Sequence, residues 1–182
     1  MTTAFTLLLG HLLGDFPLQT DKIFKLKTQS NFGLAIHVAI HLAVTALLIH
    51  RPLSHWPLLL VLGLAHFTTD WVKLNFPSKN QAAGFVGDQF VHFITILLLS
   101  IWVPDLPAIL PTWIMIPAIA LAFIPAIMIF FWVWATQIQN SSLKDDSICI
   151  TWASVSLLPI SQRIGLIIML IIALAGSSTM LM

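Results

Sequence analysis

Long apolar runs alternate with short polar stretches along the whole chain of 182 residues. A helix needs about 17–25 mostly apolar residues to cross the hydrocarbon core of a bilayer. Six segments have this character: 3–19, 33–50, 56–73, 84–103, 112–135 and 162–181. The stretch 148–161 is either an interfacial segment or an early start of the last helix. Because strands with open edges would leave backbone groups unpaired in lipid, the pattern predicts an all-α integral membrane protein with about six transmembrane helices.

Composition agrees with this prediction and indicates which kinds of partner to expect. Charged residues make up 8% of the chain and hydrophobic ones 58%, whereas a soluble domain has about 25% charged residues. The mean hydropathy is +0.96. With a net charge of +1, the chain has no basic stripe to neutralise phosphates, so we expect membrane lipid as a partner and no nucleic acid. The single cysteine, Cys149, excludes an internal disulfide framework.

Basic residues predict how the helices are oriented. Arg51 alone falls on one side of the predicted bundle. The other basic residues fall on the opposite side: Lys22, Lys25, Lys27, Lys73, Lys79, Lys144 and Arg163. Since short cytoplasmic loops carry an excess of Lys and Arg, that side is predicted to be cytoplasmic and both termini lie outside.

Ionisable side chains inside the predicted spans occur in pairs with one spacing. Such residues are rare within membranes and mark functional sites by default. Residues four apart share a helix face, so each pair presents two donor groups in one direction, as the two histidines of a H-E-x-x-H motif do. The pairs are His11/Asp15, His37/His41, His66/Asp70 and Asp88/His92.

The four pairs also share a depth and follow a repeat. They lie near the C-terminal ends of the first and third spans and near the N-terminal ends of the second and fourth, so antiparallel helices bring all of them to one level. An offset of 55 positions relates three residues of one half to three of the other: His11 to His66, Asp15 to Asp70, and His37 to His92. The repeat predicts a four-helix core, 1–103, made of two helical hairpins, 1–50 and 56–103, and followed by two further transmembrane helices in 104–182.

Eight converging donors suit one or two divalent metal ions. Imidazole and carboxylate ligands are typical of Zn, Mn or Fe sites, and we predict that all eight paired residues act as ligands. A structural polar network is the simpler alternative. In that case Asp88 would cap its helix, and Asp70 would pair with Lys73.

Four segments resemble a family of small uncharacterised bacterial inner-membrane proteins. They are HLLGDFPLQTDK (11–22), the HxxxH of residues 37–41, HFTTDWVK (66–73) and DQFVH (88–92), and the resemblance covers roughly residues 5–100. It implies a multi-pass protein of the bacterial inner membrane, with both termini periplasmic when combined with the charge pattern. A looser similarity links the His/Asp motifs to membrane-bound proteins predicted to be metal-dependent hydrolases.

These patterns favour a metal-dependent membrane hydrolase whose lipid or amphiphilic substrate arrives from the cytoplasmic side. Because the chain contains no glutamate, Asp88 or Asp15 is the expected general base. One alternative is a divalent metal-ion transporter or metal-handling protein. Another is a non-catalytic or haem-binding subunit of a membrane complex, and a homo-oligomer is also compatible with the sequence.

Overall fold

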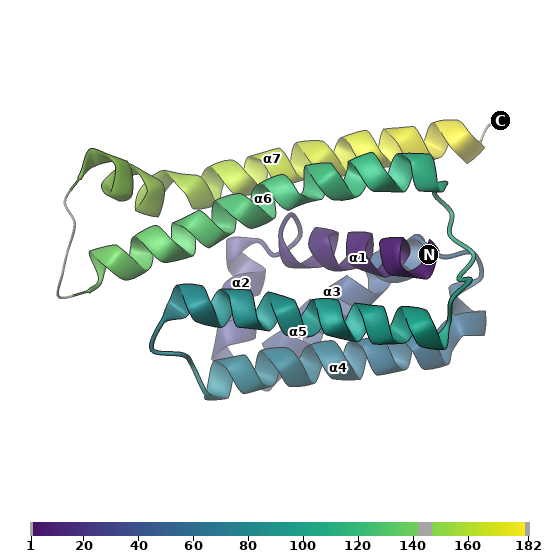
Figure 1. Ribbon diagram of the computed structural model, residues 1–182, viewed down its shortest axis with the longest axis horizontal. Coiled ribbons are helices and arrows are strands. Elements are labelled where there is room, and N and C mark those ends of the chain that lie inside the picture. The colour runs from purple at the N-terminus through teal and green to yellow at the C-terminus, as the bar shows by residue number, and fades with distance from the viewer. Residues whose placement is uncertain (1, 142–146, 181–182) are drawn as a thin grey trace.

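The computed structural model describes residues 2–141 and 147–180, and within them the chain is all-helical, as predicted (Figure 1). Lys144, which contributed to the predicted orientation, lies outside the described residues. A short 3₁₀ turn, η1, spans Pro52–His55. The α-helices are α1 (Thr2–Asp15), α2 (Asp21–Gln29), α3 (Asn31–Leu47), α4 (Trp56–Asn75), α5 (Gln81–Trp102), α6 (Thr112–Gln139) and α7 (Ile148–Met180).

Three helices are long and apolar enough to cross a membrane: Gln81–Trp102, Thr112–Gln139 and Ile148–Ser177. Helix α3 is apolar but shorter. These lengths and compositions are consistent with a membrane protein.

Several predicted boundaries differ from the observed ones, and two of the differences, in α1 and α7, change the description of a helix. Helix α1 ends at Asp15 rather than at residue 19, because Pro17 lacks a backbone N–H and cannot continue a helix. Helix α7 begins at Ile148 and runs without a break through Pro159. The ambiguous stretch 148–161 is therefore the early start of the last helix, and the predicted segment 162–181 is only its second part.

Helices α1, α3, α4 and α5 form a ring in which each contacts the next and α5 closes back onto α1. Helices α6 and α7 pack along each other, and α6 lies against α1 and α5 (Figure 1). The start of α1 and the end of α7 lie at the same end of the molecule. The interior of the four-helix ring is thus bounded on one side by the α6–α7 pair.

The segment between α1 and α3 contains an additional helix, α2, that the apolar pattern did not predict. Thr20 caps its first turn by accepting a hydrogen bond from the Ile23 N–H, and Ser30 caps α3 by accepting one from the Gly33 N–H at 3.0 Å. The turn between the helices is tight, since a Cβ at Gly33 would collide with the carbonyl oxygen of Leu26. This turn folds α2 back against α3 and directs Lys27 inward.

Small residues also set how closely α1 approaches α3. A Cβ at Gly14 would lie 2.7 Å from the His41 ring, and one at Gly10 would collide with the Thr45 hydroxyl. Beyond this contact, toward the N-terminal end of α1, the ring interior is filled by a buried apolar cluster that includes Leu7, Leu62 and Ile96. The buried ionisable side chains of the described residues are therefore confined to one layer at the other end of the ring.

Candidate metal centre

The structure brings the eight predicted histidine and aspartate side chains into one buried cluster. Each is at most 7% exposed, and His37 and His41 are fully buried. Contacts run without interruption from His41 through His11 to Asp15, and onward to the remaining members. Four helices of the ring, α1, α3, α4 and α5, contribute two residues each. Antiparallel packing thus places the four pairs at one level.

The centre of the cluster is a triangle of donor atoms from three helices. Asp15 Oδ1 lies 3.3 Å from His37 Nε2 and 3.4 Å from His66 Nε2, and the two nitrogens are 3.2 Å apart. Ligand atoms about 2.1 Å from a central ion are about 3.0–3.5 Å apart in octahedral or tetrahedral geometry. The triangle therefore has the size of one face of a metal coordination polyhedron.

A second triangle shares the His37–His66 edge. Asp70 Oδ2 lies 3.5 Å from His37 Nε2 and 3.3 Å from His66 Nε2. The His37–His66 edge is thus bridged by two carboxylates, one from α1 (Asp15) and one from α4 (Asp70). Because the two triangles share an edge, they can serve either one ion or two neighbouring ions.

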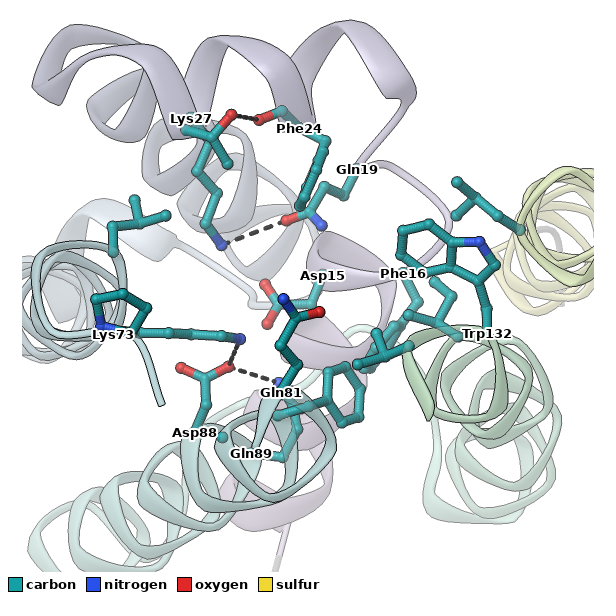
Figure 2. Close-up of a pocket in the computed structure, with 18 of the residues that line it drawn as sticks. Asp15, Phe16, Gln19, Phe24, Lys27, Lys73, Gln81, Asp88, Gln89 and Trp132 are labelled. Atoms are coloured by element: carbon teal, nitrogen blue, oxygen red, sulfur yellow. Dashed lines mark hydrogen bonds and ion pairs between the residues drawn. The ribbon is translucent and has the colours of Figure 1, made fainter. Parts of the chain in front are cut away.

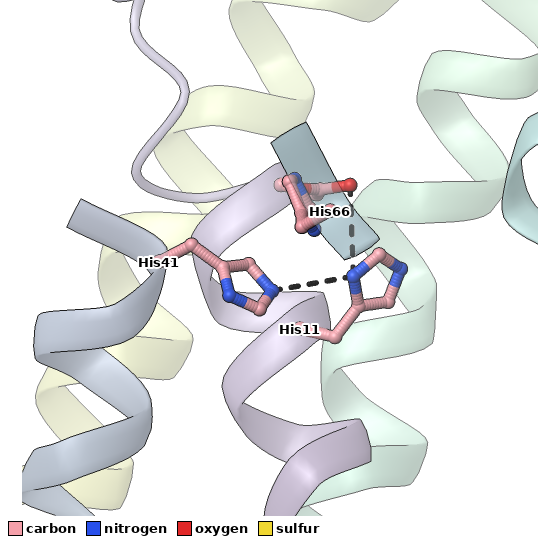
Figure 3. A group of neighbouring side chains, drawn as sticks. His11, His41 and His66 are labelled. Carbon is pink, nitrogen blue, oxygen red and sulfur yellow. Dashed lines mark hydrogen bonds and ion pairs between the residues drawn. The ribbon is translucent and has the colours of Figure 1, made fainter. Parts of the chain in front are cut away.

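The remaining members extend the cluster on both sides. On one side, His11, His41 and His66 point toward one another from α1, α3 and α4 (Figure 3), and His41 Nε2 lies 3.3 Å from His11 Nδ1. On the other side, His92 Nε2 lies 3.6 Å from Asp88 Oδ1 and 3.9 Å from Asp70 Oδ1. The donor atoms form three groups, each within 4.8 Å. His66 belongs to the first two groups, and Asp70 belongs to the last two.

Many of these atoms lack a hydrogen-bond partner although they are buried. Among the described residues, all but one of the buried side-chain N and O atoms without such a partner belong to this cluster. They include Asp15 Oδ1, Asp70 Oδ1, Asp88 Oδ1 and His92 Nε2. Leaving one buried polar atom unsatisfied costs about 1–3 kcal/mol. A structural network should satisfy its members, so this pattern fits donors arranged for an ion.

Two lysines enter the site, and the sequence alone did not identify them. Lys27, from α2, places Nζ 2.7 Å from Asp70 Oδ2, and both side chains are nearly inaccessible to solvent. Burial lowers the pKa of Lys27, but the carboxylates of Asp70 and Asp15 more than offset it and raise the pKa above the ordinary value of 10.5. The ammonium is therefore charged and neutralises part of the cluster's negative charge.

The second lysine, Lys73, donates a hydrogen bond of 2.6 Å to Asp88 Oδ2. The alternative in which Lys73 pairs with Asp70 is therefore wrong, because Lys27 occupies that position. The helix-capping alternative for Asp88 is also wrong, since Asn80 is the N-cap of α5. The only available sequence signal for Lys27 was its basic character in a segment that resembled an ordinary loop.

Two glutamines border the cluster. Gln89 Oε1 lies 3.1 Å from His11 Nε2, and its amide nitrogen donates to Asp88 Oδ2 at 3.3 Å. Gln19 Oε1 accepts from Lys27 Nζ at 3.3 Å (Figure 2). Gln89 therefore fixes the orientation of a predicted ligand, and Gln19 holds the buried ammonium.

A cavity of about 380 Å³ opens beside the cluster (Figure 2). Asp15 and Asp88 line it, whereas Asp70 is not among the lining residues. Both lysines line it as well. The two aspartates that we predicted as general bases are therefore the carboxylates of the cluster that a bound molecule can reach.

Comparison with known proteins identifies a family for this chain. No curated protein and no solved structure matches it. A family model described as "Protein of unknown function (DUF3307)" matches residues 3–116, which span α1 to α5 and the first residues of α6. The match agrees with the resemblance to an uncharacterised family, and it includes every residue of the His/Asp cluster. The chain therefore belongs to the DUF3307 family.

Proposed function

We propose that this chain is a membrane-embedded protein that binds divalent metal and hydrolyses a lipid or another amphiphile arriving from the cytoplasmic side. The observation that carries the proposal is the pair of donor triangles around His37 and His66, with edges of 3.2–3.5 Å. In this proposal the chain crosses the bacterial inner membrane six times, both termini are periplasmic, and α1–α3 and α4–α5 are repeated hairpins.

The donor set supports Zn, Mn or Fe as the ion. Imidazole and carboxylate ligands without thiolate are typical of these metals in hydrolytic and oxygen-dependent sites. A divalent ion held there supplies Lewis acidity, which polarises a substrate oxygen and makes a water molecule more acidic. Asp15 and Asp70 would bind it with His37 and His66, while the outer histidines and Asp88 would complete one or two coordination shells.

Asp88 is the better placed general base. It lines the cavity, and its Oδ2 is held by Lys73 and by Gln89, so the carboxylate has a fixed orientation. Its other oxygen, Oδ1, is buried without a hydrogen-bond partner among the described residues. A base needs hydrogen-bond reach to the proton that it accepts, and in this proposal Asp88 takes it from a water molecule in the cavity that it lines.

The geometry supports a hydrolase better than the two alternatives. A transporter requires a polar path across the membrane. Beyond the cluster, the described interior has no buried ionisable side chain, only threonine hydroxyls among apolar residues such as Leu7, Leu62 and Ile96. Haem requires space between its axial histidines, whereas the rings of His66 and His92 stack with centroids 4.3 Å apart. A polar path across the membrane and a haem between two histidines would each need the four-helix ring to open.

Metal content of the detergent-purified protein, measured by mass spectrometry, tests the proposal. We expect one or two equivalents of Zn, Mn or Fe. Asp15→Asn should lose the metal without loss of fold, because no lysine in the described part of the chain pairs with Asp15 and the amide keeps the shape. Asp105→Asn, in an exposed loop position, is the matched control and should retain it. A folded protein that stays free of metal after reconstitution would contradict the proposal.

A further inference from the structure

The cavity beside the cluster has two chemically different walls. One wall carries the ammonium groups of Lys27 and Lys73 together with Asp15 and Asp88 (Figure 2). The other is apolar and comes from α6 and α7, with Ile129, Trp132, Val133 and Leu158. Its volume of about 380 Å³ falls in the range of small-molecule sites, about 300–1,000 Å³. This division suits a ligand with a polar head and a hydrocarbon tail.

Charge indicates the sign of that head. With neutral histidines, the three carboxylates of the cluster and the two ammonium groups leave one unbalanced negative charge. One bound divalent ion changes this net charge to a single positive charge, and a second ion makes the positive charge larger. The carboxylate of Asp21 also lines the cavity, but it is exposed at the rim, where solvent and salt screen it. The metal-loaded polar wall therefore attracts an anion.

The lysines are placed to bind that anion directly. Lys27 Nζ contacts Asp70 Oδ2, the same oxygen that lies 3.3 Å from His66 Nε2 and would bind the ion. An ion on this oxygen competes with the ammonium, which then turns toward the cavity that it already lines. Lys73 is 38% exposed and can reach the same space. Two ammonium groups beside a divalent ion form a typical setting for phosphate oxygens.

We propose that the cavity binds an amphiphile with a phosphate head group, the phosphate lying between Lys27 and Lys73 and the tail along α6 and α7. The inference rests on the proposed metal centre and names the substrate class of that site. It assigns the lysines to the head and the wall containing Val133 and Leu158 to the tail. Hydrogen bonds from charged groups to phosphate give specificity, and each buried methylene adds about fourfold in affinity.

Calorimetric titration of the full-length protein in dodecyl maltoside micelles, which contain no phosphate, tests this assignment, with empty micelles as the baseline. The probes are octyl phosphate, octanol and inorganic phosphate, and the protein carries the divalent ion found on purification. We expect octyl phosphate to bind at least about tenfold more tightly than either other probe. Lys73→Gln should weaken octyl phosphate by about tenfold, the effect of one lost charge-assisted hydrogen bond. The exposed Lys79→Gln should not change it.

A tail-side variant makes the test independent of the lysines. Leu158→Trp fills the apolar end of the cavity and should weaken octyl phosphate while leaving inorganic phosphate unchanged. Val155→Trp, on the exposed face of the same helix, is the control and should change neither.

Equal binding of octyl phosphate and octanol by metal-loaded protein would overturn the phosphate assignment and leave the metal proposal standing. Equal binding of octyl phosphate and inorganic phosphate would likewise overturn the tail assignment. Metal content is measured on each sample, so a folded protein without metal would instead contradict the proposed function, and this inference with it.

Discussion

Lys27→Met removes the ammonium that lies 2.7 Å from Asp70 Oδ2 and keeps an unbranched side chain in its place. The change separates a metal centre from a structural polar network. In both cases the apo protein loses a buried ion pair. Only in a metal centre does the same change improve binding of a divalent ion, because Lys27 and the ion compete for one oxygen.

The loss of stability follows from burial of the pair. The Lys27 side chain is 9% exposed and that of Asp70 is 1% exposed, so water cannot solvate the carboxylate left behind. Breaking such a pair by removing one partner costs about 3–5 kcal/mol. For a chain of this size each kcal/mol shifts Tm by about 2–4 °C. We therefore expect the apo variant to melt about 10 °C below the apo wild type.

The gain in metal affinity follows from charge. Two like unit charges about 4 Å apart repel each other by about 4 kcal/mol at an effective dielectric constant of 20. The ion carries two positive charges, so the Lys27 ammonium opposes its binding. Movement of the freed lysine in the wild type reduces this penalty. We expect at least about a tenfold tighter Kd for the ion in Lys27→Met, so that saturating metal restores much of the lost Tm.

The assay is thermal unfolding of detergent-purified protein, followed by circular dichroism with and without the ion, together with a metal titration. Lys25→Met, exposed on the same helix, is the matched control and should change neither quantity. Because the pKa of Lys27 is raised above 10.5 in the folded protein, the stability that the pair contributes is complete below pH 10.5 and is lost as pH rises beyond the folded pKa. The apo Tm difference should therefore persist at neutral pH and shrink only at strongly alkaline pH.

Either of two results would refute the reasoning. If metal raises the Tm of Lys27→Met and of wild type by the same amount, Asp70 Oδ2 is not the oxygen for which Lys27 and the ion compete. If Lys27→Met is as stable as Lys25→Met in the apo form, the pair is not the buried contact described above.

Three further outcomes are expected. Gly14→Leu should lower Tm and metal content together, because the leucine side chain would enter the space of the His41 ring. Gly87→Leu is the control: nothing lies within 4 Å of a Cβ at that position, so Tm and metal content should not change. Chelator should lower the Tm of wild type by the equivalent of about 4 kcal/mol when the ion had been present at a thousandfold its Kd; no change in Tm would exclude a folded-state metal site. In a Cys149→Ser background, Lys79→Cys should react with a membrane-impermeant thiol reagent from the cytoplasmic side and Arg51→Cys from the periplasmic side, and the reverse pattern would contradict the predicted orientation.

Much of the site could be predicted because helix geometry is regular. A spacing of four residues fixes a shared helix face, and antiparallel order fixes the level of each pair. These two rules depend on neither loop structure nor packing detail, and they placed His11, Asp15 and His66 at one level from sequence alone. The helical class was predicted by a different rule, because an apolar run in lipid has few other structures available.

Lys27 could not be predicted because its position depends on backbone geometry that hydropathy does not encode. It lies in a stretch with charged residues and no apolar run, so it resembles an exposed loop. Two caps and the close approach at Gly33 turn that stretch into α2 and direct one of its lysines inward. The partner of Lys73 was likewise hidden, because Asp70 is closer in sequence but Asp88 is closer in space.

The lysines change the chemistry expected of the cluster. Eight histidine and aspartate donors alone would form a negative site that binds cations and could serve metal transport or storage. Two ammonium groups that contact its carboxylates and line the adjoining cavity are unfavourable for a simple cation store, because they compete with the ion that it should hold. They are favourable where an anionic group must approach a bound ion. The charge arrangement at Lys27 and Lys73 is therefore the structural reason to prefer chemistry on an anionic substrate over handling of the metal itself.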